Sequence, residues 1–405
     1  MPTGVALLRA GRRRNTFGHG MPTVQKRRVR SPVPETGCQF DERARASGFV
    51  RQSARNIQPS LAQRPLTKMM PMIDHLESER FSPMGDTPVL VLELDQAGAI
   101  ELARHHRSRT RAIIIGIDRS SSCPAVDLSL FDLLLSTRPE ADRPWVAVMT
   151  DRLDRRIAEV RKAIDRAPIA AATVCQVLRI SGGLAFSDAL NIESTAYSML
   201  LSGAEFRSWL ETRVSPDRAP DAATPVRMWR NGNLLNIALA APLQRNAIDA
   251  RMRDALFEAL AAALDDPTQP LVRLTADGAC FSTGGDLGEF GTAADLAEAH
   301  FIRMLRSNAV LLHELGARAE TWVHGACIGS GIEIPAAAAR LMATEGAFFQ
   351  LPEIRMGLIP GAGGTVTIAR RIGRHRTCYL ALSAARLRAT EALAWGLIDG
   401  IGQVP

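Results

Sequence analysis

The sequence predicts an α/β protein made of two halves behind a basic tail. Three observations support this prediction. From residue 88 onward, short apolar runs of strand length alternate with helical patterns. A segment rich in Pro, Asp and Ala, Ser215–Pro225, separates two such regions, and the second region carries glycine-rich loops between strand-like and helix-like segments. With 46% hydrophobic residues in 405, the chain can also build a large core.

The basic character of the chain belongs to its N-terminal end. The net charge is +7, but residues 1–68 carry 14 basic and 3 acidic side chains, so the remainder carries −4. Few apolar residues and two arginine clusters predict a disordered basic tail over residues 1–80. Its origin could be a targeting peptide, a basic interaction arm, or translation from a start codon placed too early, and we favour the last.

Composition also narrows the class of protein. No apolar run approaches the ~20 residues that a membrane span needs. The six cysteines form no CxxC pair, and the eight histidines show no metal-ligand spacing beside them. We therefore expect a reduced, metal-free, cytoplasmic protein that binds neither nucleic acid nor membrane.

The first half, residues 81–214, reads as a scaffold. Its expected strands are Val89–Leu94, Arg111–Asp118, Leu133–Ser136 and Trp145–Thr150, and its first expected helices are Ala99–His106 and Asp151–Asp165. Residues 166–213 then show helical patterns in which apolar positions recur every three or four residues. This half has no glycine-rich loop and no convergent pair of acids. The linker, residues 215–225, closes it.

The second half, residues 226–405, begins with a strand and a long helix. Leu234–Ala240 is the expected strand, and Asn246 is the expected N-cap of the helix, with Asp249 three residues later. Apolar residues then repeat every four positions until the helix ends before Pro267. A second strand is expected at Leu271–Thr275.

Three loops of this half carry chemistry. They are Cys280–Leu287, Trp322–Glu333 and Phe348–Thr365. Glycines between a strand and a helix let the backbone approach a ligand and leave N–H groups free at the helix start, where they can stabilise an oxyanion. Two glutamates, Glu333 and Glu353, lie in or beside these loops. Free amides next to paired carboxyls suit the chemistry of a thioester enolate.

These motifs resemble the crotonase superfamily, the enoyl-CoA hydratase/isomerase family. The resemblance rests on Phe-Ser-Thr-Gly-Gly-Asp, His-Gly-Ala-Cys-Ile-Gly-Ser-Gly-Ile-Glu, Pro-Glu-Ile-Arg-Met-Gly-Leu-Ile-Pro-Gly-Ala-Gly-Gly-Thr and the late Glu-Ala-Leu-Ala-Trp-Gly-Leu-Ile-Asp, and runs from about Val226 to Ile401. It implies a crotonase-like ββα spiral, an acyl-CoA thioester substrate, no cofactor other than the CoA of the substrate, and a homo-oligomer, either a trimer or a hexamer. It also implies a role in fatty acid metabolism.

The resemblance carries the family's binding positions onto numbered residues. The two amides of the oxyanion hole fall on Gly285 and Ser330. Gly284 and Gly361 fall where the family binds substrate and water, and the backbone of Gly361 faces that water. Ser330 stands where the family usually has glycine, which keeps the amide but adds a side chain.

The catalytic acids implied by the resemblance are Glu333 and Glu353. In hydratases of this family, the two glutamates activate a water and deliver a proton to the α-carbon of the substrate. We therefore expect hydration of a 2-enoyl-CoA. An enoyl-CoA isomerase and a non-catalytic acyl-CoA-binding subunit remain as alternatives.

The helical segment of the first half has a further interpretation. The family normally has several dozen helical residues after the Gly-Leu-Ile-Asp motif, but this sequence ends at Pro405. Residues 166–213 look like that segment. The hypothesis is that residues 81–214 are a degenerate crotonase unit whose helices cover the site of the second half.

Overall fold

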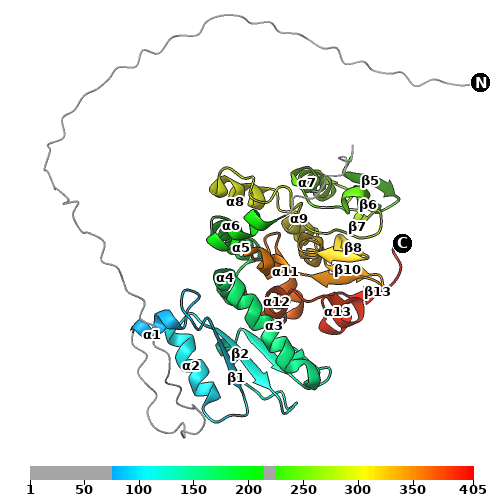
Figure 1. The fold of residues 1–405 in the computed structure, drawn as a ribbon. Coiled ribbons are helices and arrows are strands. Elements are labelled where there is room, and N and C mark those ends of the chain that lie inside the picture. The colour runs from blue at the N-terminus through cyan, green and yellow to red at the C-terminus, as the bar shows by residue number, and fades with distance from the viewer. Residues whose placement is uncertain (1–74, 214–223) are drawn as a thin grey trace, which may run out of the picture. The chain divides into compact units, whose positions relative to one another are not determined.

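The computed structural model describes residues 75–213 and 224–405 (Figure 1). Its first element, helix α1 (His75–Arg80), occupies the last six residues of the range that the sequence assigns to the tail. The rest of that tail and residues 215–223 of the linker lie outside the described residues. All described residues belong to one compact unit.

The first half contains a four-stranded parallel sheet in the order β1-β2-β3-β4. Its strands are β1 (Val89–Glu93), β2 (Ile113–Asp118), β3 (Leu133–Ser136) and β4 (Val146–Ala147). Every residue of β2 and β3 is buried, as expected for apolar strands covered on both faces. Helix α2 (Ala99–Arg109) packs on β1. The last predicted strand is shorter than expected, because a 3-10 turn begins at Thr150.

Four helices follow this sheet: α3 (Leu153–Arg166), α4 (Pro168–Ser181), α5 (Phe186–Leu201) and α6 (Ala204–Thr212). Helix α4 is mostly buried because it contacts β2, α3 and α5 of the first half, and α11 and α12 of the second half (Figure 1). Pro168 stands at its start, where a missing N–H costs nothing. The amides of Ile169 and Ala170 donate to the two carboxylate oxygens of Glu205.

Two sheets form the frame of the second half. The larger has the order β13-β10-β8-β7-β6-β5 and the smaller β12-β11-β9. The chain adds strands to the two sheets alternately: β8 and β10 join the larger sheet, and β9 and β11, which follow them, join the smaller one. The strands are β5 (Val226–Asn231), β6 (Leu234–Leu239), β7 (Leu271–Ala276), β8 (Ala319–Val323), β9 (Ala326–Ile328), β10 (Arg340–Ala343), β11 (Phe348–Gln350), β12 (Leu387–Arg388) and β13 (Gly400–Ile401).

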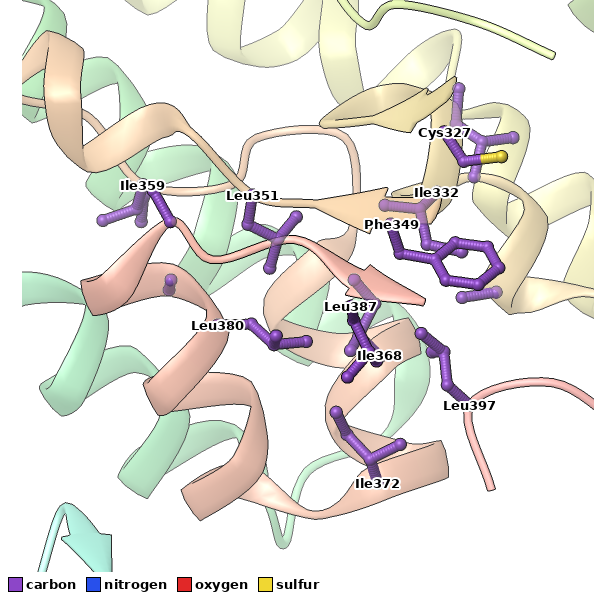
Figure 2. Close-up of a cluster of buried hydrophobic side chains, with 14 of the residues drawn as sticks. Cys327, Ile332, Phe349, Leu351, Ile359, Ile368, Ile372, Leu380, Leu387 and Leu397 are labelled. Carbon is purple, nitrogen blue, oxygen red and sulfur yellow. The ribbon is translucent and has the colours of Figure 1, made fainter. Parts of the chain in front are cut away.

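Helices surround these sheets. They are α7 (Ala250–Asp265), α8 (Leu296–Leu305), α9 (Asn308–Glu314), α10 (Ser330–Glu333), α11 (Gly364–Ile372), α12 (Arg374–Ser383) and α13 (Ala389–Trp395). Figure 2 shows side chains from the smaller sheet and from α11 and α12 meeting in one core, including Phe349, Ile368 and Leu380. Leu274 and Leu341 of the larger sheet belong to the same core. The same core continues to Ile115 and Val174 of the first half. The two halves therefore share one hydrophobic core.

The predicted N-cap of the first long helix is wrong. The cap of α7 is Asp249, whose side chain accepts a hydrogen bond of 2.7 Å from the amide of Met252. Asn246 is buried with a φ of 51°. Its side chain binds the backbone of Ala241, Asp277 and Cys280, so it ties the loop after β6 to the loop after β7 instead of starting a helix.

Arginines of α12 join the second half to the first. Arg374 donates to the carbonyl oxygens of Phe131 and Leu128. Arg376 is buried, and its guanidinium donates to the carbonyl oxygens of Trp145 at 3.0 Å and Ala141 at 2.7 Å. Both guanidinium groups thus donate hydrogen bonds to backbone carbonyl groups of the first half.

Replacing Arg376 by methionine is expected to lower the free energy of unfolding by about 2–4 kcal/mol, because two buried carbonyl groups lose their donors. Urea unfolding followed by circular dichroism measures the change. Arg340→Met is the control, since this side chain is 62% exposed and its ion pair with Glu320 is 3.6 Å long. Equal effects of the two substitutions would contradict the prediction.

Within residues 75–213 and 224–405, no helix is long and apolar enough to cross a membrane. The same residues contain no group of three or more His, Cys, Asp or Glu side chains placed to hold a metal ion.

Candidate active site

A cavity of about 380 Å³ lies where the glycine-rich loops meet helix α5. Five of the residues singled out in the sequence line it, namely Gly285, Ser330, Glu333, Glu353 and Gly361. The remaining one, Gly284, stands next to the lining with a φ of 92°. A Cβ atom on Gly284 would lie 2.7 Å from the carbonyl oxygen of Ile328, so only glycine lets these two loops approach so closely.

Two backbone amides of the cavity wall have no acceptor in the described part of the chain. They are the N–H groups of Gly285, in the loop after β7, and Ser330, the first residue of α10. The bridge between Ser282 and Cys327 holds the two loops side by side. Two free N–H groups on one cavity wall can bind a carbonyl oxygen and stabilise negative charge that develops on it.

Glu333 is buried at the end of α10 and binds the start of α11. One carboxylate oxygen, Oε2, accepts hydrogen bonds from the amides of Ala362 at 2.7 Å and Gly364 at 3.0 Å. Burial raises the pKa of Glu333 to about 7, although these amides favour the ionised form and act in the opposite direction. The group can thus change its charge near neutral pH.

Glu353 is buried in the 3-10 turn Glu353–Met356, which follows β11. Its Oε2 atom has no hydrogen-bond partner among the described residues. Burial, and then the charge of Glu333, raise the pKa of Glu353 well above its ordinary value. A carboxyl that lacks donors in a dry site is most stable when it carries its proton.

The two carboxyl groups face the same small space. An ideal Cβ placed on Gly329 would lie 2.6 Å from Oε1 of Glu353 and 3.7 Å from Oε1 of Glu333. The structure therefore brings together two amide donors and two acids that the sequence places in three separate loops.

The second half of the chain is similar to known proteins. The family model for enoyl-CoA hydratase/isomerase matches residues 230–403. A carnitinyl-CoA dehydratase from Salmonella arizonae is 30% identical over 177 residues, which cover 44% of this chain and 67% of the relative. The chain belongs to the enoyl-CoA hydratase/isomerase family, the crotonase superfamily. It is a crotonase-type acyl-CoA enzyme.

Solved structures of the crotonase superfamily are also similar to it. An enoyl-CoA hydratase from Thermoplasma volcanium is 30% identical with a TM-score of 0.41, and the match covers 44% of this chain and 72% of that one. An enoyl-CoA hydratase/isomerase from Mycobacterium paratuberculosis is 26% identical with the same TM-score, over 45% and 74% of the two chains.

The serine that replaces the usual crotonase glycine places a hydroxyl at the cavity. Ser330 is buried, and its Oγ atom has no hydrogen-bond partner among the described residues. Its amide stays without an acceptor. The substitution thus adds an unpaired polar atom beside the proposed thioester site.

Helix α5 supplies five cavity residues that the sequence reasoning missed, and two of them, Glu193 and Tyr197, carry ionisable groups. Glu193 is a third buried carboxyl, and it binds the start of α11. The ring of Tyr197 covers Gly361, because a Cβ on that glycine would lie 2.5 Å from the ring. The predicted helical segment, residues 166–213, therefore reaches the crotonase cavity, while its origin as a degenerate crotonase unit remains a hypothesis.

His324, in the loop between β8 and β9, does not line the cavity. Nε2 of His324 lies 2.9 Å from the carbonyl oxygen of Gly278, which fixes a loop outside the cavity lining.

Proposed function

We propose that this crotonase-family enzyme adds water to the double bond of a 2-enoyl-CoA thioester. One observation carries the proposal: the free amides of Gly285 and Ser330 line the same cavity as two buried carboxyls. One of these carboxyls accepts backbone hydrogen bonds, and the other has an oxygen without a donor. A carnitinyl-CoA dehydratase among the relatives, whose name denotes the reverse type of reaction, supports it.

In this proposal, the amides of Gly285 and Ser330 bind the thioester oxygen. They withdraw electron density from the double bond and make the β-carbon electrophilic. When water adds, the negative charge moves to the thioester oxygen, where the two N–H groups stabilise the enolate. Gly361 lies in the same cavity as Glu333, and its backbone amide also favours the ionised form of that carboxyl.

The two acids differ in a way that assigns their roles. Glu333 accepts two amide hydrogen bonds, so it is the group more easily ionised, and it takes a proton from the attacking water. Glu353 has an oxygen without a donor, so it holds a proton and transfers it to the α-carbon. The new bonds are O–Cβ and H–Cα. The proton left on Glu333 returns to Glu353 to restore the starting state.

A pair of acids favours hydration over isomerisation, because moving a double bond needs one group to remove and return a proton.

No cofactor other than the CoA of the substrate enters these steps. A trimeric or hexameric assembly, a cytoplasmic location and a role in fatty acid metabolism remain predictions.

The test is hydration of crotonyl-CoA and of longer 2-enoyl-CoA thioesters, measured as loss of the absorbance of the conjugated enoyl group. We expect turnover with at least one chain length. Binding of these thioesters without turnover would instead support a non-catalytic acyl-CoA-binding subunit.

The rate should also depend on pH near neutrality. Because burial raises the pKa of Glu333 to about 7, the base becomes protonated as the pH falls through that value. We expect kcat/KM to decrease about tenfold per pH unit below about pH 7. The pH profile of crotonyl-CoA hydration measures this limb, and a constant kcat/KM down to about pH 5 would contradict the prediction.

A further inference from the structure

A third carboxyl, Glu193, binds the same turn as Glu333. Its Oε1 accepts a hydrogen bond of 2.7 Å from the amide of Gly363. Its Oε2 accepts from the amide of Thr365 at 2.7 Å and from the hydroxyl of Thr365 at 2.6 Å. Glu193 is buried on α5, a helix of the first half that precedes this turn by 170 residues in the chain.

Glu333 and Glu193 bind alternate backbone amides at the start of α11. Those of Ala362 and Gly364 bind Glu333, whereas those of Gly363 and Thr365 bind Glu193. Each carboxyl therefore approaches the turn from its own side. A change in the position of this turn would therefore alter the hydrogen bonds of both carboxyls.

We propose that Glu193 is a positioning residue of the acid–base site: it fixes the turn whose amides hold the carboxylate of Glu333. The proposal rests on the function proposed above, in which Glu333 is the base. It gives the helical segment of the first half a part in catalysis beyond covering the acyl pocket.

The charges around Glu193 show why the turn amides matter. Glu333 on α10, Glu353 after β11 and Arg303 on α8 interact with it electrostatically, and the phenol of Tyr197 lies in the same cavity. Burial and the charge of Glu333 raise the pKa of Glu193 to about 8. Amide donors offset part of this unfavourable environment for both carboxyls, and they do so only while the turn keeps its place.

The first test is Glu193→Gln, which keeps the shape of the side chain. One end of the new amide group is a donor, so at least one turn N–H loses its acceptor. We expect kcat for crotonyl-CoA hydration to fall about 100-fold, because a displacement of about 1 Å in a catalytic group has this effect. KM should stay within about twofold of the native value.

Glu205→Gln is the matched control. Glu205 lies on α6 in the same helical segment and also accepts two helix-start amides, at 2.8 and 3.0 Å, but it lies outside the cavity lining. We expect it to lower the thermal midpoint and to leave kcat and KM within about twofold. If Glu193→Gln keeps its kcat, or if both substitutions lower kcat equally, Glu193 is only a structural cap and the proposal is wrong.

A second test does not depend on turnover. In a double-mutant cycle of Glu193→Gln with Glu333→Gln, the effects on the unfolding equilibrium constant should deviate from multiplicativity by at least about tenfold, or about 1.4 kcal/mol. The cycle of Glu205→Gln with Glu333→Gln should be multiplicative within about twofold. Absence of coupling in the first cycle overturns the proposal even if hydration is observed, whereas absence of hydration in the native protein overturns only the proposed function.

If Glu193→Gln does not fold, Thr365→Val replaces it in both tests. This substitution removes the hydroxyl bond to Glu193 and keeps both amides. We expect a decrease in kcat of about tenfold and coupling to Glu333→Gln in the same direction. An unchanged kcat without coupling would overturn the proposal.

Discussion

Replacing Glu353 by glutamine is expected to lower kcat for enoyl-CoA hydration by about 10³-fold, because the α-carbon loses its proton donor. Glutamine keeps the volume of the side chain, so KM should change little. Glu333→Gln should have an effect of similar size, since an amide cannot accept the proton of water. Because the two acids act as a unit, the double variant should be about as slow as the slower single one.

Glu298→Gln is the control for both substitutions. Glu298 is an exposed glutamate in the first turn of α8, a helix that borders the cavity, and it does not line the cavity itself. We expect its kcat to stay within about twofold of the native value. If Glu333→Gln and Glu353→Gln also remained within that range, the assignment of acid and base would be wrong.

The parts of the site that the sequence predicts are the parts that local geometry determines. Ser330 and Glu353 follow strands β9 and β11 within three residues, whereas Gly285 follows β7 after a loop of eight residues. Gly284 and Gly329, each next to one of these residues, have a positive φ. The parallel neighbours β9 and β11 carry their loops to the same edge of the smaller sheet, and the bridge between Ser282 and Cys327 joins the loop after β7 to them. A short motif therefore contains most of the information about where these residues lie.

Glu193 could not be placed in this way, because its position depends on how α5 packs on α11. One signal was present in the sequence. Leu190, Glu193 and Tyr197 follow the helical spacing of a buried face, and a carboxyl in such a face must find donors. The pattern indicates that Glu193 has buried partners, but it does not identify them.

Two local differences between prediction and structure have similar causes. Strand β5 is largely exposed, so it lacks the apolar pattern used to find strands, although the two-residue Gly232-Asn233 turn that joins it to β6 is a hairpin signal. Asn246 looks like a helix cap by residue type. Its three buried hydrogen bonds join two loops, and they are made only after these loops have folded together.

Replacing Gly329 by alanine is expected to lower kcat by at least about 100-fold. The added methyl would lie 2.6 Å from Oε1 of Glu353 and 3.7 Å from Oε1 of Glu333, in the space between the two acids. It must displace at least one of these carboxyl groups, and a displacement of about 1 Å is enough for such a loss. The measurement is crotonyl-CoA hydration together with thermal unfolding of the variant.

The control must separate backbone strain from blocking of the site, because Gly329 has a φ of 51° and alanine disfavours positive φ. Gly316→Ala serves this purpose. Gly316 has a φ of 56°, and a Cβ there meets no atom within 4 Å. Both variants should lose about 1–2 kcal/mol of stability or more, but only Gly329→Ala should lose activity. If Gly316→Ala were equally inactive, the loss would reflect backbone strain, and the space beside Gly329 would not be where the two acids act.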